Sequence, residues 1–159
     1  MTPARTAPRV TRGLAYVLGT WFGCGLVPLA PGTAGTLGAL PLYLAIRSGG
    51  PLVVLVVAAV LAVVGVWAAG HVVRHTGQSD PQIVVIDEVV GVLVTLAAST
   101  GTWTSLVIGF VLFRIFDQWK PWPARALESL PGGLGVVMDD VAAGIWGAGV
   151  LVVVTAGMS

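Results

Sequence analysis

The run LVVLVVAAVLAVVGVWAAGHVV, residues 52–73, decides the fold, because it holds no lysine, arginine or acidic residue over 22 positions. A helix that crosses a bilayer needs about 20 mostly apolar residues. The rest of the chain has the same character, with 56% apolar and only 9% charged side chains among 159 residues. Ordinary soluble domains carry roughly 25% charged residues. We therefore predict an all-α fold, a polytopic transmembrane helical bundle.

The N-terminal part predicts a tail followed by an interrupted helical region. Residues 1–12 form a basic tail, and residues 13–159 form a single transmembrane domain. The uncharged stretch 13–46 is too long for one helix, and its Pro- and Gly-rich segment 27–36 favours two helical pieces. We expect residues 14–30 to form a re-entrant or interfacial helix, with about five membrane crossings in the whole chain.

The C-terminal part predicts an up-and-down helix pair and one last helix. The sequence Ser-Thr-Gly-Thr at 99–102 interrupts an apolar stretch, so we expect helices near 83–98 and 103–120. The Pro- and Gly-rich segment 121–136 is expected to be a loop. The last helix should then begin at about residue 137.

The charged residues are distributed unevenly along the chain. All seven acids lie between Asp80 and Asp140, whereas the first 79 residues carry only basic charge. Because the expected helices alternate in direction, the start of one, the end of the next and the start of the last meet at one membrane face, together with the break at 31–36. These helix ends carry Asp87 and Glu88, then Arg114, Asp117 and Lys120, then Asp139 and Asp140.

Carboxylates at the edge of membrane helices are candidate functional groups, because burying them in a bilayer costs free energy. For the first acidic pair the alternative is a polar loop outside the membrane, and for the second it is simple complementation of a helix dipole. Adjacent acids point about 100° apart on a helix, so we expect one of each pair to face the site. The acids would supply oxygen ligands for Mg²⁺, namely Asp87, Glu88, Asp117, Asp139 and Asp140.

Basic residues and a glycine-rich segment predict an anion site beside these acids. Arg114, Asp117 and Lys120 follow i, i+3, i+6 spacing and so share one helical face. The alternative is an internal salt bridge with snorkelling at a helix end. The sequence PGTAGT at 31–36 precedes an expected helix, where free backbone N–H groups could hold phosphate. A plain turn between helices is the alternative there.

At these residues the sequence resembles the phosphatidylglycerophosphatase A family over nearly its whole length beyond the N-terminal dozen. The matching segments are APGTAGT at 30–36, IDEVVG at 86–91, FRIFDQWKPWP at 113–123 and GGLGVVMDD at 132–140. The resemblance implies a Mg²⁺-dependent membrane enzyme that hydrolyses phosphatidylglycerophosphate to phosphatidylglycerol and inorganic phosphate.

On this hypothesis the catalytic candidates are Asp87, Asp117 and Lys120. The metal would be held by a subset of the five acids, and the candidate phosphate-binding residues are Gly32, Thr33, Gly35, Thr36, Arg114 and Lys120. A carboxylate, either Asp117 or Asp87, would activate water as a general base or attack the phosphorus directly. The alternative function is a small ion or proton transporter that uses intramembrane carboxylates.

The expected partners are the lipid substrate and membrane lipids, without nucleic acid, and a homo-oligomer is left open. Lysine and arginine are enriched in cytoplasmic loops. The acidic face carries four basic residues, Arg74, Arg114, Lys120 and Arg125, and the opposite face carries Arg47. If residues 14–30 do not cross the membrane, Arg5, Arg9 and Arg12 join the acidic face and enlarge its excess of basic residues. We therefore expect the site on the cytoplasmic face of a bacterial inner membrane.

Overall fold

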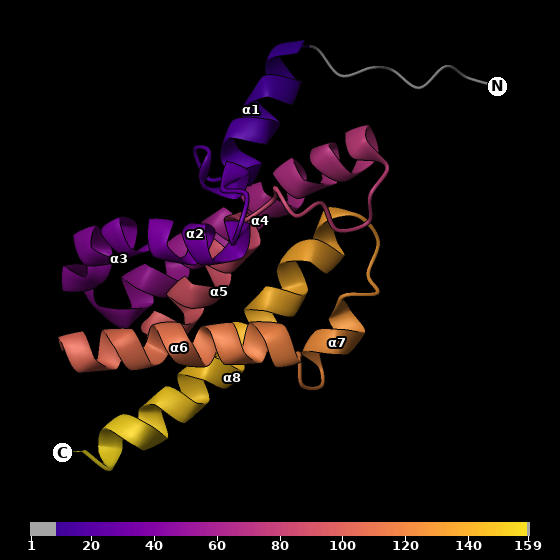
Figure 1. Cartoon of the computed structure of the whole chain (residues 1–159). Coiled ribbons are helices and arrows are strands. Elements are labelled where there is room, and N and C mark those ends of the chain that lie inside the picture. The colour runs from indigo at the N-terminus through magenta and orange to yellow at the C-terminus, as the bar shows by residue number, and fades with distance from the viewer. Residues whose placement is uncertain (1–8, 159) are drawn as a thin grey trace.

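A computed structural model describes residues 9–158, and every regular element in that range is a helix. The helices follow one another without a strand, as Figure 1 shows. In chain order they are α1 Arg9–Gly19, η1 Cys24–Leu26, α2 Pro31–Gly38, α3 Leu40–Ile46, η2 Arg47–Gly49, α4 Gly50–Thr76, α5 Ile86–Leu96, α6 Trp103–Trp119, α7 Ala124–Leu127 and α8 Gly133–Ala156.

Helix α5 lies at the centre of the bundle and packs against α2, α4, α6 and α8. It is apolar on nearly every side, which is typical of a helix surrounded by protein. Gly91 and Gly144 permit its close crossing with α8, because a Cβ atom at Gly144 would clash with the Gly91 carbonyl oxygen. Small residues of this kind let helix backbones approach closely in membrane proteins. The first turn of α5, with its two acids, is thereby fixed against α8.

Two stretches of the described chain are long and apolar enough to cross a membrane, Pro31–Thr76 and Gly133–Ala156. Helix α4, with 27 residues, lies within the first of them and exposes Leu55, Val56, Val60 and Val63. Helix α6 has 17 residues and α5 has 11, which is shorter than the roughly 20 residues of a straight span. The count of five crossings therefore stays a prediction.

The expected helix pair is confirmed, with α5 and α6 close to the predicted ranges 83–98 and 103–120. The intervening turn holds Thr102, which caps α6 by accepting a hydrogen bond from the backbone N–H of Ser105 at 3.2 Å. At this end of the bundle, Arg47 donates a hydrogen bond to the carbonyl oxygen of Gly101 at 2.9 Å. Arg47 therefore lies at the end of α6 remote from Arg114 and Lys120, as the alternating helices predict.

The start of the last helix was predicted wrongly, because α8 begins at Gly133 rather than at about residue 137. A Cβ atom at Gly133 would clash with the backbone of Val66 and Gly70 in α4. The glycines here serve close packing of helical backbone instead of forming a loop. Asp139 and Asp140 consequently lie in the second turn of α8, and complementation of a helix dipole, which is confined to the first turn, does not explain them.

The N-terminal region differs in detail from the expectation. Residues 9–12 begin α1, while residues 1–8 of the predicted tail, with Arg5, lie outside the described residues. Helix α1 has 11 residues and η1 has three, so neither is long enough to cross a bilayer alone. In Figure 1, α1 projects from the rest of the bundle. An interfacial location for this region stays a prediction.

Candidate active site

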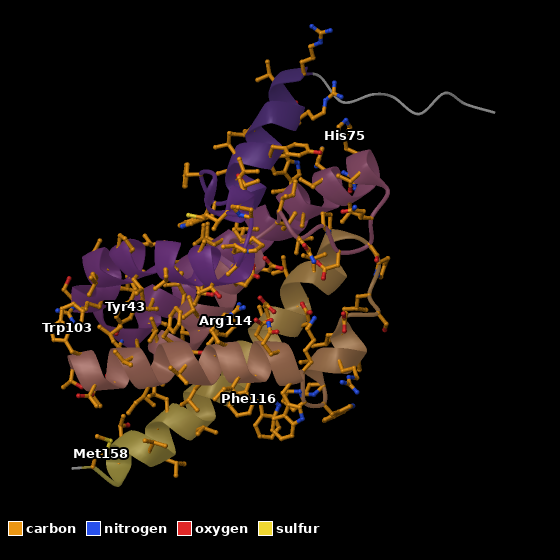
Figure 2. All side chains as sticks on the ribbon, viewed as in Figure 1. Tyr43, His75, Trp103, Arg114, Phe116 and Met158 are labelled. Carbon is orange, nitrogen blue, oxygen red and sulfur yellow. The ribbon has the colours of Figure 1, made fainter. Side chains whose placement is uncertain are left out.

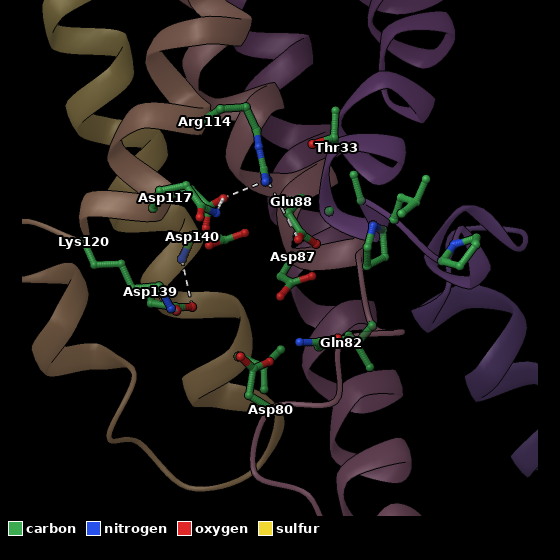
Figure 3. Close-up of a pocket in the computed structure, with 18 residues that line it drawn as sticks. Thr33, Asp80, Gln82, Asp87, Glu88, Arg114, Asp117, Lys120, Asp139 and Asp140 are labelled. Carbon is green, nitrogen blue, oxygen red and sulfur yellow. Dashed lines mark hydrogen bonds and ion pairs between the residues drawn. The ribbon is translucent and has the colours of Figure 1, made fainter.

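The charged helix ends meet in one cleft with a volume of about 480 Å³. Its walls come from the start of α2, the link between α4 and α5, the start of α5, the end of α6 and the second turn of α8, as Figure 3 shows. Nine of the predicted site residues line it, namely Gly32, Thr33, Asp87, Glu88, Arg114, Asp117, Lys120, Asp139 and Asp140. The convergence predicted from alternating helices is thus present in the structure.

Three of the acids form a cluster that we call the acidic triad, Asp87, Glu88 and Asp140. One carboxylate oxygen from each lies within 4.8 Å of the others. Asp87 Oδ1, Glu88 Oε2 and Asp140 Oδ2 are buried and have no hydrogen-bond partner among the described residues. Like charges at this separation repel one another in a site shielded from water. The triad therefore has the oxygen ligands and the unpaired acceptor atoms that suit a hard cation.

The two other acids are paired with cations. Arg114 Nη1 lies 2.7 Å from Asp117 Oδ2 and 4.0 Å from Glu88 Oε1. The same Nη1 atom has no partner with hydrogen-bond geometry among the described residues. Asp117 thus holds the Arg114 guanidinium at the edge of the acidic triad.

Lys120 is the second cation and is positioned by the end of α6. It adopts a left-handed conformation with φ of 48°, which ends the helix before Pro121. Its Nζ donates to Asp139 Oδ2 at 2.7 Å and lies 3.4 Å from Glu128 Oε1. Burial alone lowers the pKa of Lys120, but the hydrogen bond from its Nζ to Asp139 and the charges of both acids raise it above its ordinary value. Lys120 is therefore a fixed positive charge.

The glycine-rich segment contributes only its first residues to the cleft. Pro31 is the first residue of α2, so PGTAGT forms helix rather than a turn before one. Gly32 and Thr33 line the cleft and lie in the first turn of α2, where backbone N–H groups have no partner within the helix. Gly35 packs against Val85, and the buried Thr36 donates its hydroxyl to the Gly32 carbonyl at 2.8 Å. Gly35 and Thr36 therefore do not line the cleft.

The absence of a side chain at Gly32 matters for the neighbouring charges. A Cβ atom there would clash with Glu88 Oε1 and would lie 3.1 Å from Arg114 Nη1. A side chain at residue 32 would have to displace the Glu88 carboxylate, so glycine suits the close approach of α2 to the triad and to Arg114. The cleft thus combines the start of α2, two cations and the five predicted acids.

Two expectations about the acids need correction or addition. We expected one acid of each adjacent pair to point away, but all four line the cleft, because its walls surround the helix ends on more than one side. Asp139 points to Lys120, whereas Asp140 joins Asp87 and Glu88. The sequence reading also missed Asp80 and Gln82, which line the same cleft. Their position in a short polar link at the acidic face could have indicated this.

Fold and site together define a helical protein with two stretches apolar enough to cross a membrane and a cleft that gathers acids beside two cations. A sequence model of the family described as Phosphatidylglycerophosphatase A matches residues 17–155. The chain belongs to this family of phosphatases. It is therefore an enzyme, and the predicted resemblance is confirmed.

Curated relatives agree with this assignment. The chain is 40% identical to Phosphatidylglycerophosphatase A of Escherichia coli strain K12, covering 86% of this chain and 80% of the relative. It is 36% identical to the protein of that name from Haemophilus influenzae, covering 82% of each. It is 43% identical to a Putative phosphatidylinositol-3-phosphatase of Bacteroides thetaiotaomicron, covering 84% and 88%. These relatives support a lipid phosphatase and give the transporter alternative no support. No solved structure matches the chain.

Proposed function

We propose that this protein hydrolyses the terminal phosphomonoester of phosphatidylglycerophosphate and releases phosphatidylglycerol and inorganic phosphate. The observation that carries the proposal is the acidic triad facing Arg114 and Lys120 in one cleft. Two relatives are named for this activity. The chemistry of the cleft supports it, because cations and helix N–H groups suit the phosphate while acids suit a metal and a reacting water.

We propose that the triad binds Mg²⁺, and the residues fit this ion. One carboxylate oxygen of each acid lies within 4.8 Å of the others, and each acid has a buried oxygen without a hydrogen-bond partner among the described residues. Mg²⁺ takes a few carboxylates and completes its shell with water and substrate phosphate. When bound, it would offset the repulsion between the acids and the phosphate and polarise the reacting phosphoryl group. Asp117 and Asp139, which the sequence included among candidate ligands, are already neutralised by cations.

Other groups in the cleft would bind the phosphate and orient the groups that bind it. Arg114 and Lys120 would bind the nonbridging phosphate oxygens, assisted by the backbone of Gly32 and Thr33. Asp117 would orient Arg114, and Asp139 would orient Lys120. In the net reaction the phosphorus–oxygen bond to glycerol breaks, one water oxygen joins the phosphate, and the glycerol oxygen gains a proton.

Two routes for the attack remain as alternatives, with Asp117 or Asp87 as the reacting carboxylate. The carboxylate either takes a proton from the attacking water or attacks the phosphorus itself and forms an aspartyl phosphate that water then cleaves. The stereochemistry at phosphorus separates these routes, measured on a substrate whose terminal phosphate is made chiral with oxygen isotopes. Inversion in the released phosphate supports direct water attack, whereas retention requires the aspartyl phosphate.

We further propose that the cleft faces the cytoplasm from the inner membrane. Arg74, Arg114, Lys120 and Arg125 belong to the cleft end of the bundle, and Arg47 to the other. The exposed rings of Trp119 and Trp122 near the cleft suit a membrane interface. Substrate made from cytoplasmic precursors would then reach the site without crossing the bilayer.

Phosphate release from purified protein in detergent tests the proposed activity. The substrates are phosphatidylglycerophosphate and a phosphatidylinositol 3-phosphate, because one relative carries the latter specificity in its name. We expect faster release from phosphatidylglycerophosphate in the presence of Mg²⁺. Release only from the inositol lipid would transfer the proposal to that substrate, and release from neither would contradict it.

A further inference from the structure

A second cavity lies beside α6, nearer than the cleft to the Trp103 end of that helix. It has a volume of about 190 Å³ and lies between α2 and α3 on one side and α6 on the other. We call this cavity the groove. Every residue that lines it is apolar, namely Leu37, Leu40, Leu44, Trp103, Leu106, Val107 and Phe110. None of these residues belongs to the catalytic site described above.

The groove and the phosphate cleft share the same helix faces. On α6, Arg114 and Asp117 line the cleft, and Phe110, Val107 and Trp103 continue at spacings of three or four residues. Residues at such spacings lie on one face of a helix. Figure 2 shows Arg114 and Trp103 well separated along α6, and a separation of 11 positions corresponds to about 16 Å of helix.

The opposite wall repeats this arrangement. Thr33 lines the cleft, while Leu37, Leu40 and Leu44 follow at spacings of four, three and four residues through α2 and α3. At the cleft end of these two walls, Gly32 comes close to Arg114. A ligand held there would have its phosphate among polar groups and its adjoining segment between two apolar walls.

We propose that this groove binds an acyl chain of the lipid whose phosphate occupies the cleft. The proposal rests on the proposed function, because that substrate is a diacyl lipid with a terminal phosphate. The proposal is supported by the order of residues along the two walls, because each wall changes from polar to apolar with distance from the cleft, as such a lipid changes from headgroup to tail. The groove thereby makes acyl-chain length a determinant of catalytic efficiency.

Kinetics on substrates of increasing acyl length test the proposal. Val107 lines the groove and is 62% exposed, so Val107→Trp should fill the groove without disturbing the core. Ile115→Trp is the matched control, because Ile115 is 49% exposed, lies outside the groove and is turned about 80° around α6 from Val107. Thermal unfolding of both variants checks that they fold.

In the wild type and in Ile115→Trp, kcat/KM should rise with acyl length. In Val107→Trp this rise should flatten, with kcat/KM for the longest substrate about tenfold below that of Ile115→Trp. Equal profiles in the two variants, or a wild-type profile without any rise, would overturn the proposal.

Photolabelling tests acyl-chain binding in the groove independently of turnover. A phosphatidic acid with a photoactivatable group in its acyl chain should label residues 37–44 and 103–110 of the wild-type protein. Unlabelled phosphatidic acid should reduce that labelling, and phosphatidylcholine should not. Labelling that is spread equally over α4 and unaffected by phosphatidic acid would show bulk lipid only and overturn the proposal. Absent phosphate release together with specific labelling would instead contradict the proposed function alone.

Discussion

Lys120 Nζ lies 2.7 Å from Asp139 Oδ2, and this contact joins the end of α6 to the second turn of α8. The lysine is thereby fixed at the side of the cleft opposite the start of α2. A flexible surface lysine would lose side-chain entropy on binding phosphate, whereas this one is already ordered. The ion pair thus prepares a phosphate-binding charge.

Replacement of Lys120 by glutamine should lower kcat/KM about 10²-fold, because a preorganised charge on the phosphate is lost. Asp139→Asn should have a smaller effect in the same direction, since the lysine then keeps its charge but loses its anchor. The measurement is Mg²⁺-dependent phosphate release by both variants. Near wild-type rates in Lys120→Gln would remove Lys120 from the site.

The raised pKa of Lys120 predicts that this side chain stays charged at alkaline pH. A lysine whose folded-state pKa is raised keeps its charge below that value and loses it only as pH rises through it. The ion pair with Asp139 should therefore persist throughout the assay range. Lys120→Arg, which is protonated at all accessible pH values, should show the same pH profile as the wild type up to about pH 9.5. An alkaline fall in the wild type that disappears in Lys120→Arg would refute this prediction.

Gly32→Ala should reduce activity without unfolding the protein. The new methyl group would displace the Glu88 carboxylate and press on Arg114, so we expect kcat/KM to fall about tenfold. Gly149→Ala in α8 is the control, because a Cβ atom there meets nothing within 4 Å. Both alanines favour helix, and neither should lower the melting temperature. If the two variants had equal activity, the close contact at Gly32 would have no catalytic role.

Single cysteines test the membrane orientation. In a Cys24→Ser background, Arg125→Cys marks the cleft end and Thr100→Cys marks the opposite end, both at exposed positions. A membrane-impermeant thiol reagent applied to spheroplasts should label Thr100→Cys and leave Arg125→Cys unlabelled until the membrane is opened. The reverse pattern would place the cleft on the periplasmic side.

The convergence of the charged groups could be predicted from the sequence, because alternating helices force their ends to particular membrane faces. This reasoning brought Asp87, Asp117 and Asp140 together without coordinates. It could not predict pairing within the cluster. Asp139 pairs with Lys120, whereas Asp140 joins the triad. This difference depends on the rotation of α8 about its axis, which the packing of α8 on α5 sets.

The structural roles of the glycines were harder to predict from the sequence than the positions of the charged residues. In the sequence Gly133 and Gly135 indicate a loop, yet they begin α8, because close contacts with α4 and with the preceding segment leave no room for side chains. Local preference favours a turn there, and tertiary packing overrides it. For the same reason Gly35 was assigned to phosphate binding, although it serves the contact of α2 with Val85.

The most direct test of the central claim is Mg²⁺-dependent phosphate release from phosphatidylglycerophosphate by Asp140→Asn, beside the wild type and Asp80→Asn. Asp140 belongs to the acidic triad, whereas Asp80 lines the cleft outside it. Removing one of three like charges should not lower the melting temperature without Mg²⁺, so lost activity would not reflect misfolding. We predict a fall of about 10²-fold or more for Asp140→Asn and near wild-type release for Asp80→Asn. Undiminished release by Asp140→Asn would contradict the acidic triad as the centre of the reaction.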